Sequence, residues 1–207
     1  MFDNFQSDIL FLLITGSFVV WLIIAGTAKI IQNKKLNEMV ALLNEKNFDE
    51  FDRLMDSRLV KLVFDPFNVD YIKLNGCIYK QDKKAIDNAF SRFDQVKLTA
   101  LQRDDIDLKA FNYYLSEGNV AKVHKYYKNI KDSSSNKMKK EVHRLYDIYV
   151  EKGSKYLDEL IEETAALDER YKSSNELLIS AIYGNLKNTE KEREYRELAE
   201  RHLSGNP

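Results

Sequence analysis

The sequence contains few of the residues that make turns. Glycine and proline together account for 7 and 2 of 207 residues, about 4% of the chain where roughly 12% is usual. Since tight turns depend heavily on these two residues, their scarcity excludes a β-sandwich, a collagen-like chain and a Pro/Gly-rich disordered chain. The composition therefore predicts an all-α protein.

The sequence also lacks the residues and motifs of common chemical sites. One cysteine, Cys77, excludes an intrachain disulfide and a cysteine-based zinc site. No phosphate-binding or dinucleotide-binding glycine motif, no nucleophile elbow and no HExxH motif occurs. The histidines at positions 124, 143 and 202 have no metal-site spacing. We therefore expect no catalytic residue, no cofactor and no metal site.

A long apolar stretch begins the chain. Residues 9–28 carry no charge, and 20 helical residues cover the ~30 Å hydrocarbon core of a bilayer. A buried helix of a soluble core is the first alternative, but the stretch has no polar face. A cleaved signal peptide is the second, but the preceding residues include Asp3 and Asp8 and no basic residue. We predict an uncleaved transmembrane helix over residues 9–31.

Basic residues follow this stretch and none precedes it. Lys29, Lys34 and Lys35 flank its C-terminal side, and the positive-inside rule places such residues in the cytoplasm. Residues 1–8 then form a short extracytoplasmic N-terminus. The expected localisation is a single-pass membrane protein with a cytoplasmic C-terminal domain, and the bilayer is a partner through residues 9–31.

Behind the stretch, one pattern recurs at about 35 residues. An amphipathic helix ends in a polar or glycine turn and a second amphipathic helix begins, with turns at Asn47, Asp82, Gly118, Gly153 and Asn188. The helices carry one-face apolar stripes such as Leu36, Met39, Val40 and Leu43. This pattern predicts five helical hairpins over residues 34–203 and a disordered tail over residues 204–207. A compact bundle of unrelated hairpins is the alternative.

The second unit resembles the tetratricopeptide repeat family. The family has a helix–turn–helix unit of 34 residues, and its pattern is matched here by Tyr71, Leu74, Ile78, Tyr79, Lys80, Gln81, Asp82, Ala85 and Ile86. The chain departs from the family in lacking proline at the unit ends and a Leu-Gly pair in the first helices. The resemblance implies a right-handed α-solenoid whose first helices line a concave binding groove, without naming a ligand.

Residues about 100° from the apolar stripe of each first helix should face that groove. They are Ile72, Tyr79, Lys109, Tyr113, Lys140, His143, Asp147, Glu176 and Tyr183. Tyrosine and charged side chains suit reversible recognition of a protein segment. The expected function is a membrane-tethered adaptor or scaffold that recruits a protein partner, and it is not an enzyme.

A basic segment supplies a second hypothesis. Between Lys122 and Arg144 lie eight basic residues: Lys122, Lys125, Lys128, Lys131, Lys137, Lys139, Lys140 and Arg144. They could bind an anionic partner as a regulatory or nucleic-acid-binding module. Alternatively they form a solvated face that is balanced by the acidic residues 158–169 of the next helix. The even balance of 32 basic and 33 acidic residues does not favour nucleic acid.

Two points stay open at this stage. The run from Leu59 to Phe64 is either a buried connector or an exposed docking patch. If the topology is reversed, the protein would instead be an extracytoplasmic subunit of an envelope assembly.

Overall fold

A computed structural model describes residues 26–131 and 136–204. The described residues form helices and no strand, so the all-α class is confirmed for this part of the chain. The chain divides between Val96 and Lys97 into two compact units, which we call unit 1 and unit 2.

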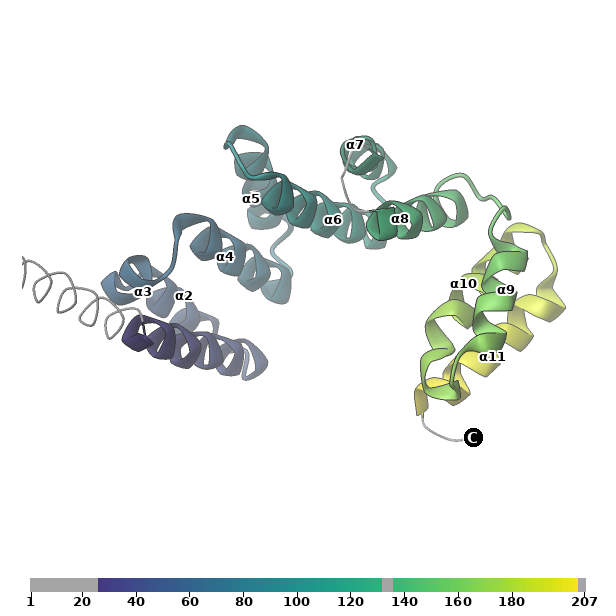
Figure 1. Cartoon of the computed structure of the whole chain (residues 1–207), viewed down its shortest axis with the longest axis horizontal. Helices are drawn as coiled ribbons and strands as arrows, with labels where there is room; N and C mark the ends of the chain where they lie inside the picture. Colours follow the sequence, from purple (N-terminus) through teal and green to yellow (C-terminus); the bar gives the residue numbers. More distant parts are fainter. Residues whose placement is uncertain (1–25, 132–135, 205–207) are drawn as a thin grey trace, which may run out of the picture. The chain divides into compact units, whose positions relative to one another are not determined.

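Unit 1 contains helical residues 26–44 followed by four helices (Figure 1). These are α2 (Phe48–Asp56), α3 (Arg58–Val63), α4 (Pro66–Lys80) and α5 (Lys83–Gln95). Unit 2 contains α6 (Ala100–Ser116), α7 (Val120–Lys131), α8 (Asn136–Tyr149), α9 (Leu157–Ala166), the 3₁₀ turn η1 (Glu169–Tyr171), α10 (Ser173–Asn185) and α11 (Thr189–Ser204). All five predicted turns lie between helices, at the expected residues.

The predicted membrane span lies almost wholly outside the described residues. Of the range 9–31 only residues 26–31 are described, and they are helical. In the described part of the chain no helix is both long enough and apolar enough to cross a membrane. The helix runs without interruption from residue 26 to residue 44, so the predicted boundary between a span ending at 31 and a domain starting at 34 falls inside one continuous helix and stays a prediction. No helix breaker lies there.

Four of the turns between described helices share one backbone geometry. Each has a residue in the left-handed region, with φ between 56° and 67°, followed by an Asn or Asp. The backbone N–H of that Asn or Asp donates to the carbonyl five residues earlier, which is the Schellman arrangement. Its side chain then caps the next helix. The left-handed residues are Lys46, Gln81, Gly118 and Lys187, and the caps are Asn47, Asp82, Asn119 and Asn188.

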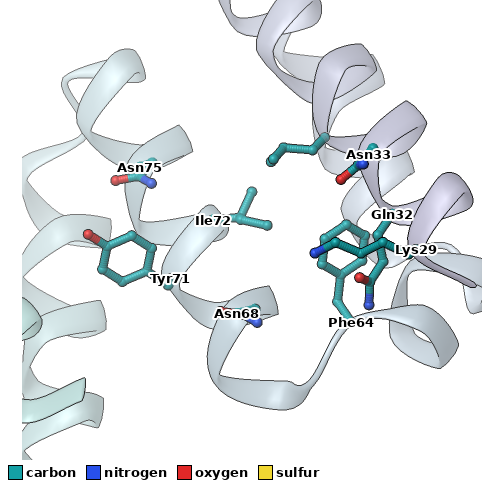
Figure 2. A pocket seen from close by; sticks show the side chains of 9 residues that line it. Lys29, Gln32, Asn33, Phe64, Asn68, Tyr71, Ile72 and Asn75 are labelled. Carbon is teal, nitrogen blue, oxygen red and sulfur yellow. The ribbon is translucent and has the colours of Figure 1, made fainter. Parts of the chain in front are cut away.

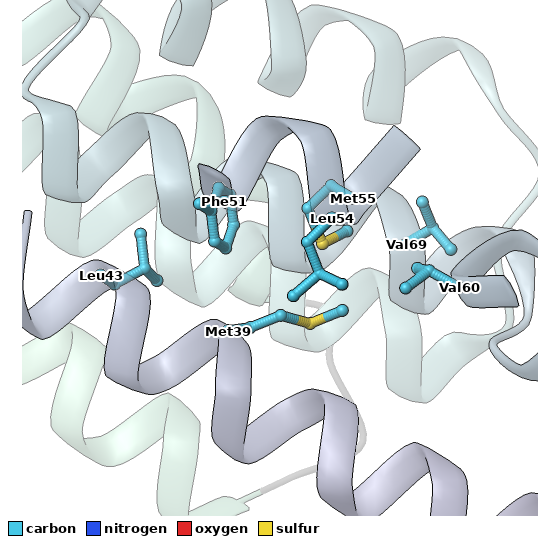
Figure 3. Packing of buried hydrophobic residues seen from close by; sticks show 7 residues of the cluster. All are labelled: Met39, Leu43, Phe51, Leu54, Met55, Val60 and Val69. Carbon is cyan, nitrogen blue, oxygen red and sulfur yellow. The ribbon is translucent and has the colours of Figure 1, made fainter. Parts of the chain in front are cut away.

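The core of unit 1 forms where helical residues 26–44 pack against α2. Met39 and Leu43 face Phe51, Leu54 and Met55, and Figure 3 shows these side chains meeting between the two helices. Val60 of α3 and Val69 of α4 extend the same cluster. Burying a side chain of this size contributes roughly 1.5–3 kcal/mol. The cluster therefore fixes how α3 and α4 follow the first hairpin.

Unit 2 is held together mainly around α10. This helix packs against α8, α9 and α11, and its Leu178, Ile179 and Ile182 join Leu160 of α9 and Ile148 of α8 in one cluster. Neighbours cover most of its surface, so α10 buries residues on several faces. A one-stripe description is too narrow for this helix.

One boundary and one segment differ from the sequence-based expectation. Ser204 belongs to α11 and not to a tail, while residues 205–207 lie outside the described part. The run from Leu59 to Phe64 is neither purely buried nor purely exposed. It forms most of α3, where Val60 is fully buried while Leu62 is 82% exposed.

Candidate functional site

A pocket of about 330 Å³ lies between helical residues 26–44 and α4. Figure 2 shows the side chains of the two helices facing each other across it, with Phe64 from the connector before α4 at one end. The lining residues are Lys29, Gln32, Asn33, Leu36, Phe64, Asn68, Tyr71, Ile72 and Asn75. Both helices are the first helices of predicted hairpins, and Ile72 is the lining residue that the sequence-based groove prediction included.

Local sequence positions α4 beside the first helix. Asp65 caps α4, accepting from the backbone N–H of Asn68 at 3.1 Å, and Pro66 takes the first helical position, where no N–H is needed. The side-chain amide of Gln32 donates to the backbone carbonyl of Val63. Phe64 packs against the core of unit 1. These contacts hold the start of α4 close to Gln32.

The pocket combines amide and apolar side chains. Gln32, Asn33, Asn68 and Asn75 each carry both a hydrogen-bond donor and an acceptor. Leu36, Ile72 and Phe64 supply apolar surface, Lys29 supplies one positive charge, and no lining residue is a carboxylate. Such a lining can pair with the N–H and C=O groups of an extended chain while it accommodates an apolar side chain.

Exposed apolar residues continue the pocket by one turn on each helix. Val40 lies four residues after Leu36 and Tyr79 four residues after Asn75, so each shares a helix face with its predecessor. Leu36 is 43% exposed, Val40 49% and Tyr79 57%. We call this surface the first-helix groove: the pocket residues together with Val40 and Tyr79. Two predicted groove residues, Ile72 and Tyr79, belong to it.

Two groove residues predicted in unit 2 lie on α10 and are buried. Glu176 is 3% exposed and lines a separate pocket of about 390 Å³ with residues of α9 and α11, and Tyr183 is 8% exposed. Their helix, α10, is enclosed by its neighbours. Glu176 accepts from Nδ1 of His202 at 2.8 Å, and Tyr183 stacks on Tyr195.

The remaining predicted groove residues have contacts within unit 2. Lys109 and Tyr113 are half-buried on α6, where the Tyr113 ring meets that of Tyr114. His143 is hydrogen-bonded to the hydroxyl of Tyr127 at 2.7 Å. Lys140 is exposed and ion-paired, and Asp147 lies so close to Gly153 that a Cβ there would be 2.5 Å from its carboxylate.

The basic segment is partly neutralised by the next helix. Arg144, 4% exposed, pairs with Glu159 at 2.8 Å and with Glu163 at 3.0 Å. Lys140 pairs with the same two carboxylates at 2.5 and 3.0 Å. A hydrogen bond from Arg144 lowers the pKa of Glu163. The expectation that Arg144 belongs to an exposed anion-binding patch is wrong, because its guanidinium is buried against α9; the alternative of charge balance by acidic residues holds here.

The other basic residues of the segment are distributed differently. Nζ of Lys122 lies 4.5 Å from the Tyr114 ring centroid, and Nζ of Lys125 lies 4.9 Å from that of Tyr126. Lys128 is exposed and Lys139 half-buried. The side chains of Lys131 and Lys137 lie outside the described part.

The described residues include three histidines and one cysteine. Within them no group of three or more His, Cys, Asp or Glu side chains could hold a metal ion. His124 pairs with the Tyr146 hydroxyl at 2.7 Å, so each histidine contacts a neighbouring side chain. Burial raises the pKa of the Cys77 thiol, which disfavours a reactive thiolate.

Comparison with known proteins finds no matching family model, no matching curated protein and no matching solved structure. The candidate site is therefore argued from its own geometry.

Sequence reasoning missed most of the first-helix groove. The polar pocket residues Gln32, Asn33, Asn68 and Asn75 belong to none of the sites predicted from the sequence. Leu36 and Val40 were assigned to core packing, whereas only Met39 and Leu43 of that stripe are buried. The stripe itself gave no signal of this, because its spacing of i, i+3, i+4 and i+7 is that of one ordinary packed face.

Proposed function

We propose that this protein is a membrane-tethered helical-repeat adaptor that holds an extended segment of a partner protein in the first-helix groove. The observation that carries the proposal is the mixed lining of the pocket between helical residues 26–44 and α4. The side-chain amides of Asn33 and Asn75 pair with the polar groups of the segment's backbone, since the Gln32 and Asn68 amides already donate to Val63 and Asp65. Leu36 and Ile72 contact an apolar side chain of the segment. Because no lining residue is a carboxylate, the pocket does not repel an acidic segment.

The recurrence of one turn geometry supports a repeat architecture. A Schellman turn followed by an Asn or Asp cap closes four of the predicted hairpins in the described part of the chain. The left-handed residues at 46, 81 and 118 are 35 and 37 residues apart. A five-hairpin, tetratricopeptide-like solenoid over residues 34–203 therefore remains our proposal for the architecture, with the right hand that the family resemblance implies.

The membrane anchor is proposed from the sequence. Residues 9–28 are uncharged, and Lys29, Lys34 and Lys35 follow on one side only. Both Lys29 and Lys34 are exposed, while Lys35 pairs with Glu38 at 2.7 Å. Anchoring a weak binder beside its partners raises its effective concentration. Recruitment at the cytoplasmic face of a membrane is the mechanism that this arrangement supports.

The topology predicts a labelling result. In a Cys77→Ser background, a single cysteine is placed at Ser134, and intact cells are treated with a membrane-impermeant maleimide. We expect no labelling until the cells are opened, because positive flanks stay in the cytoplasm. Labelling of intact cells would place the helical domain outside and would contradict the cytoplasmic assignment.

The groove predicts a site-specific crosslink. A photo-reactive residue at Leu36 should yield a discrete crosslinked partner in the protein's own cells, and one at Arg193 of α11, which is 75% exposed, should not. Replacing Asn33 and Asn75 together by alanine should reduce the yield at Leu36 at least about fivefold, since each lost hydrogen bond costs about 0.5–1.5 kcal/mol.

Both crosslinking measurements need an unchanged fold, which circular dichroism and the melting temperature of the double variant would check. Equal yields at Leu36 and Arg193, or a yield that the double variant leaves unchanged, would exclude the first-helix groove as the binding surface.

A further inference from the structure

The short helix α3 presents an amphipathic outer face. Leu62 is 82% exposed and Leu59 is 40% exposed, and they lie three residues apart on one side. Arg58 and Lys61 are exposed beside them. The inner side holds the helix in place, because Val60 is fully buried in the core of unit 1. Val60 alone packs α3 into the core, so the exposed leucines at 59 and 62 are not needed for the packing of unit 1.

A contact places α3 next to the end of the apolar stretch. The Gln32 side chain donates to the carbonyl of Val63, the last residue of α3. Gln32 lies four residues beyond Ala28, the last residue of the uncharged stretch, and both belong to the same continuous helix. At 1.5 Å per residue the separation along the helix is about 6 Å. Ile30, between them, is 69% exposed.

The charges around α3 suit an anionic surface. Lys29, Lys34, Arg58 and Lys61 are exposed on the two neighbouring segments. Of the nearby carboxylates, Asp56 is bound by Lys73 at 2.7 Å and lies 3.7 Å from Lys61. The other, Asp65, caps α4. Basic side chains that flank exposed leucines are typical of segments that lie in the headgroup region of a bilayer.

We propose that α3 is a second membrane contact, with Leu59 and Leu62 at the boundary of the acyl chains and Arg58 and Lys61 at the lipid phosphates. This inference rests on the membrane anchor of the proposed function. It adds that unit 1 is seated on the bilayer at two points, the end of the apolar stretch and α3. Two contacts fix the orientation of unit 1 to the membrane, which a single helix does not do.

Spin labelling of the full chain tests this inference. The chain, with Cys77→Ser, is reconstituted in vesicles of phosphatidylcholine and phosphatidylglycerol and labelled at Leu62→Cys with a nitroxide. Insertion of about 5–10 Å should make the label collide with oxygen more than with a water-soluble nickel chelate. A matched label at Leu101→Cys, on a residue of α6 that is 74% exposed, should show the opposite preference.

Two further arms separate the possible outcomes. Arg58→Glu with Lys61→Glu should move the label at Leu62 into water while the chain stays in the vesicles. If alkaline carbonate extracts the chain, the anchor is wrong and this inference fails with it. If the chain resists carbonate and the label at Leu62 is as accessible to nickel as that at Leu101, only the inference about α3 is overturned.

Discussion

Replacing Arg144 with methionine is expected to lower the free energy of unfolding of unit 2 by about 2–4 kcal/mol. Breaking a buried ion pair costs about 3–5 kcal/mol, and we reduce this because Glu159 and Glu163 are 38% and 37% exposed. The variant leaves these two carboxylates together with only Lys140 beside them. Urea unfolding followed by circular dichroism, with hydrogen exchange to locate the change in residues 97–204, measures the effect.

Lys140→Met is the matched control, because Lys140 binds the same two carboxylates one helical turn away. Its side chain is 54% exposed, and exposed ion pairs contribute only about 0–1 kcal/mol. A loss for Lys140→Met as large as that for Arg144→Met would show that burial of the guanidinium does not matter.

The same pair predicts an effect of acid. The hydrogen bond from Arg144 lowers the pKa of Glu163 below its ordinary 4.5, so the unfolded state takes up a proton at a higher pH than the folded state. The contribution of Glu163 to stability is therefore full above pH 4.5 and is lost as the pH falls through the lowered pKa. In Arg144→Met this part of the acid dependence should become smaller without vanishing, because Lys140 still lowers the pKa of Glu163, and an unchanged dependence would contradict the assignment.

Replacing Gly76 with alanine is expected to destabilise unit 1 by up to about 2 kcal/mol. A Cβ at this position would lie 2.4 Å from Cε1 and 2.9 Å from Cζ of Phe51. Phe51 is 1% exposed and enclosed by the core, so its ring has little space to move. Overpacking of this kind lowers the free energy of unfolding by about 1–3 kcal/mol. Alanine has a better helix propensity than glycine, which offsets about 1 kcal/mol of that loss. Denaturant unfolding with hydrogen exchange in residues 26–96 measures the loss.

Two comparisons separate the contact from the backbone effect. Gly184→Ala, also within a helix, brings a Cβ only to 3.3 Å from the flexible carboxylate of Glu192, and we expect a neutral or stabilising change. Phe51→Leu combined with Gly76→Ala should lose less than the sum of the two single changes, because the clashing ring atoms are gone. Strict additivity would show that the two residues do not interact.

The sequence by itself determined the helical class and the positions of the turns. Asn47, Asp82 and Asn188 were readable as turn residues because a helix start needs a side-chain acceptor from a residue close in sequence. Such hydrogen bonds close within three residues and depend little on the rest of the chain. The charge balance between the basic segment and the acidic helix after it was also readable, since the two helices are neighbours in sequence.

The tertiary structure alone decided which faces are covered. Arg144 reads as one more exposed basic residue, and only the folded unit, which brings Glu159, Glu163 and the Tyr156 ring to it, buries it. Leu36 and Met39 belong to one apolar stripe, yet Met39 packs on α2 while Leu36 lines a pocket against α4. Turns follow from local backbone hydrogen bonds, whereas the burial of a helix face depends on the neighbour that packs against it, and a stripe of apolar residues does not name that neighbour.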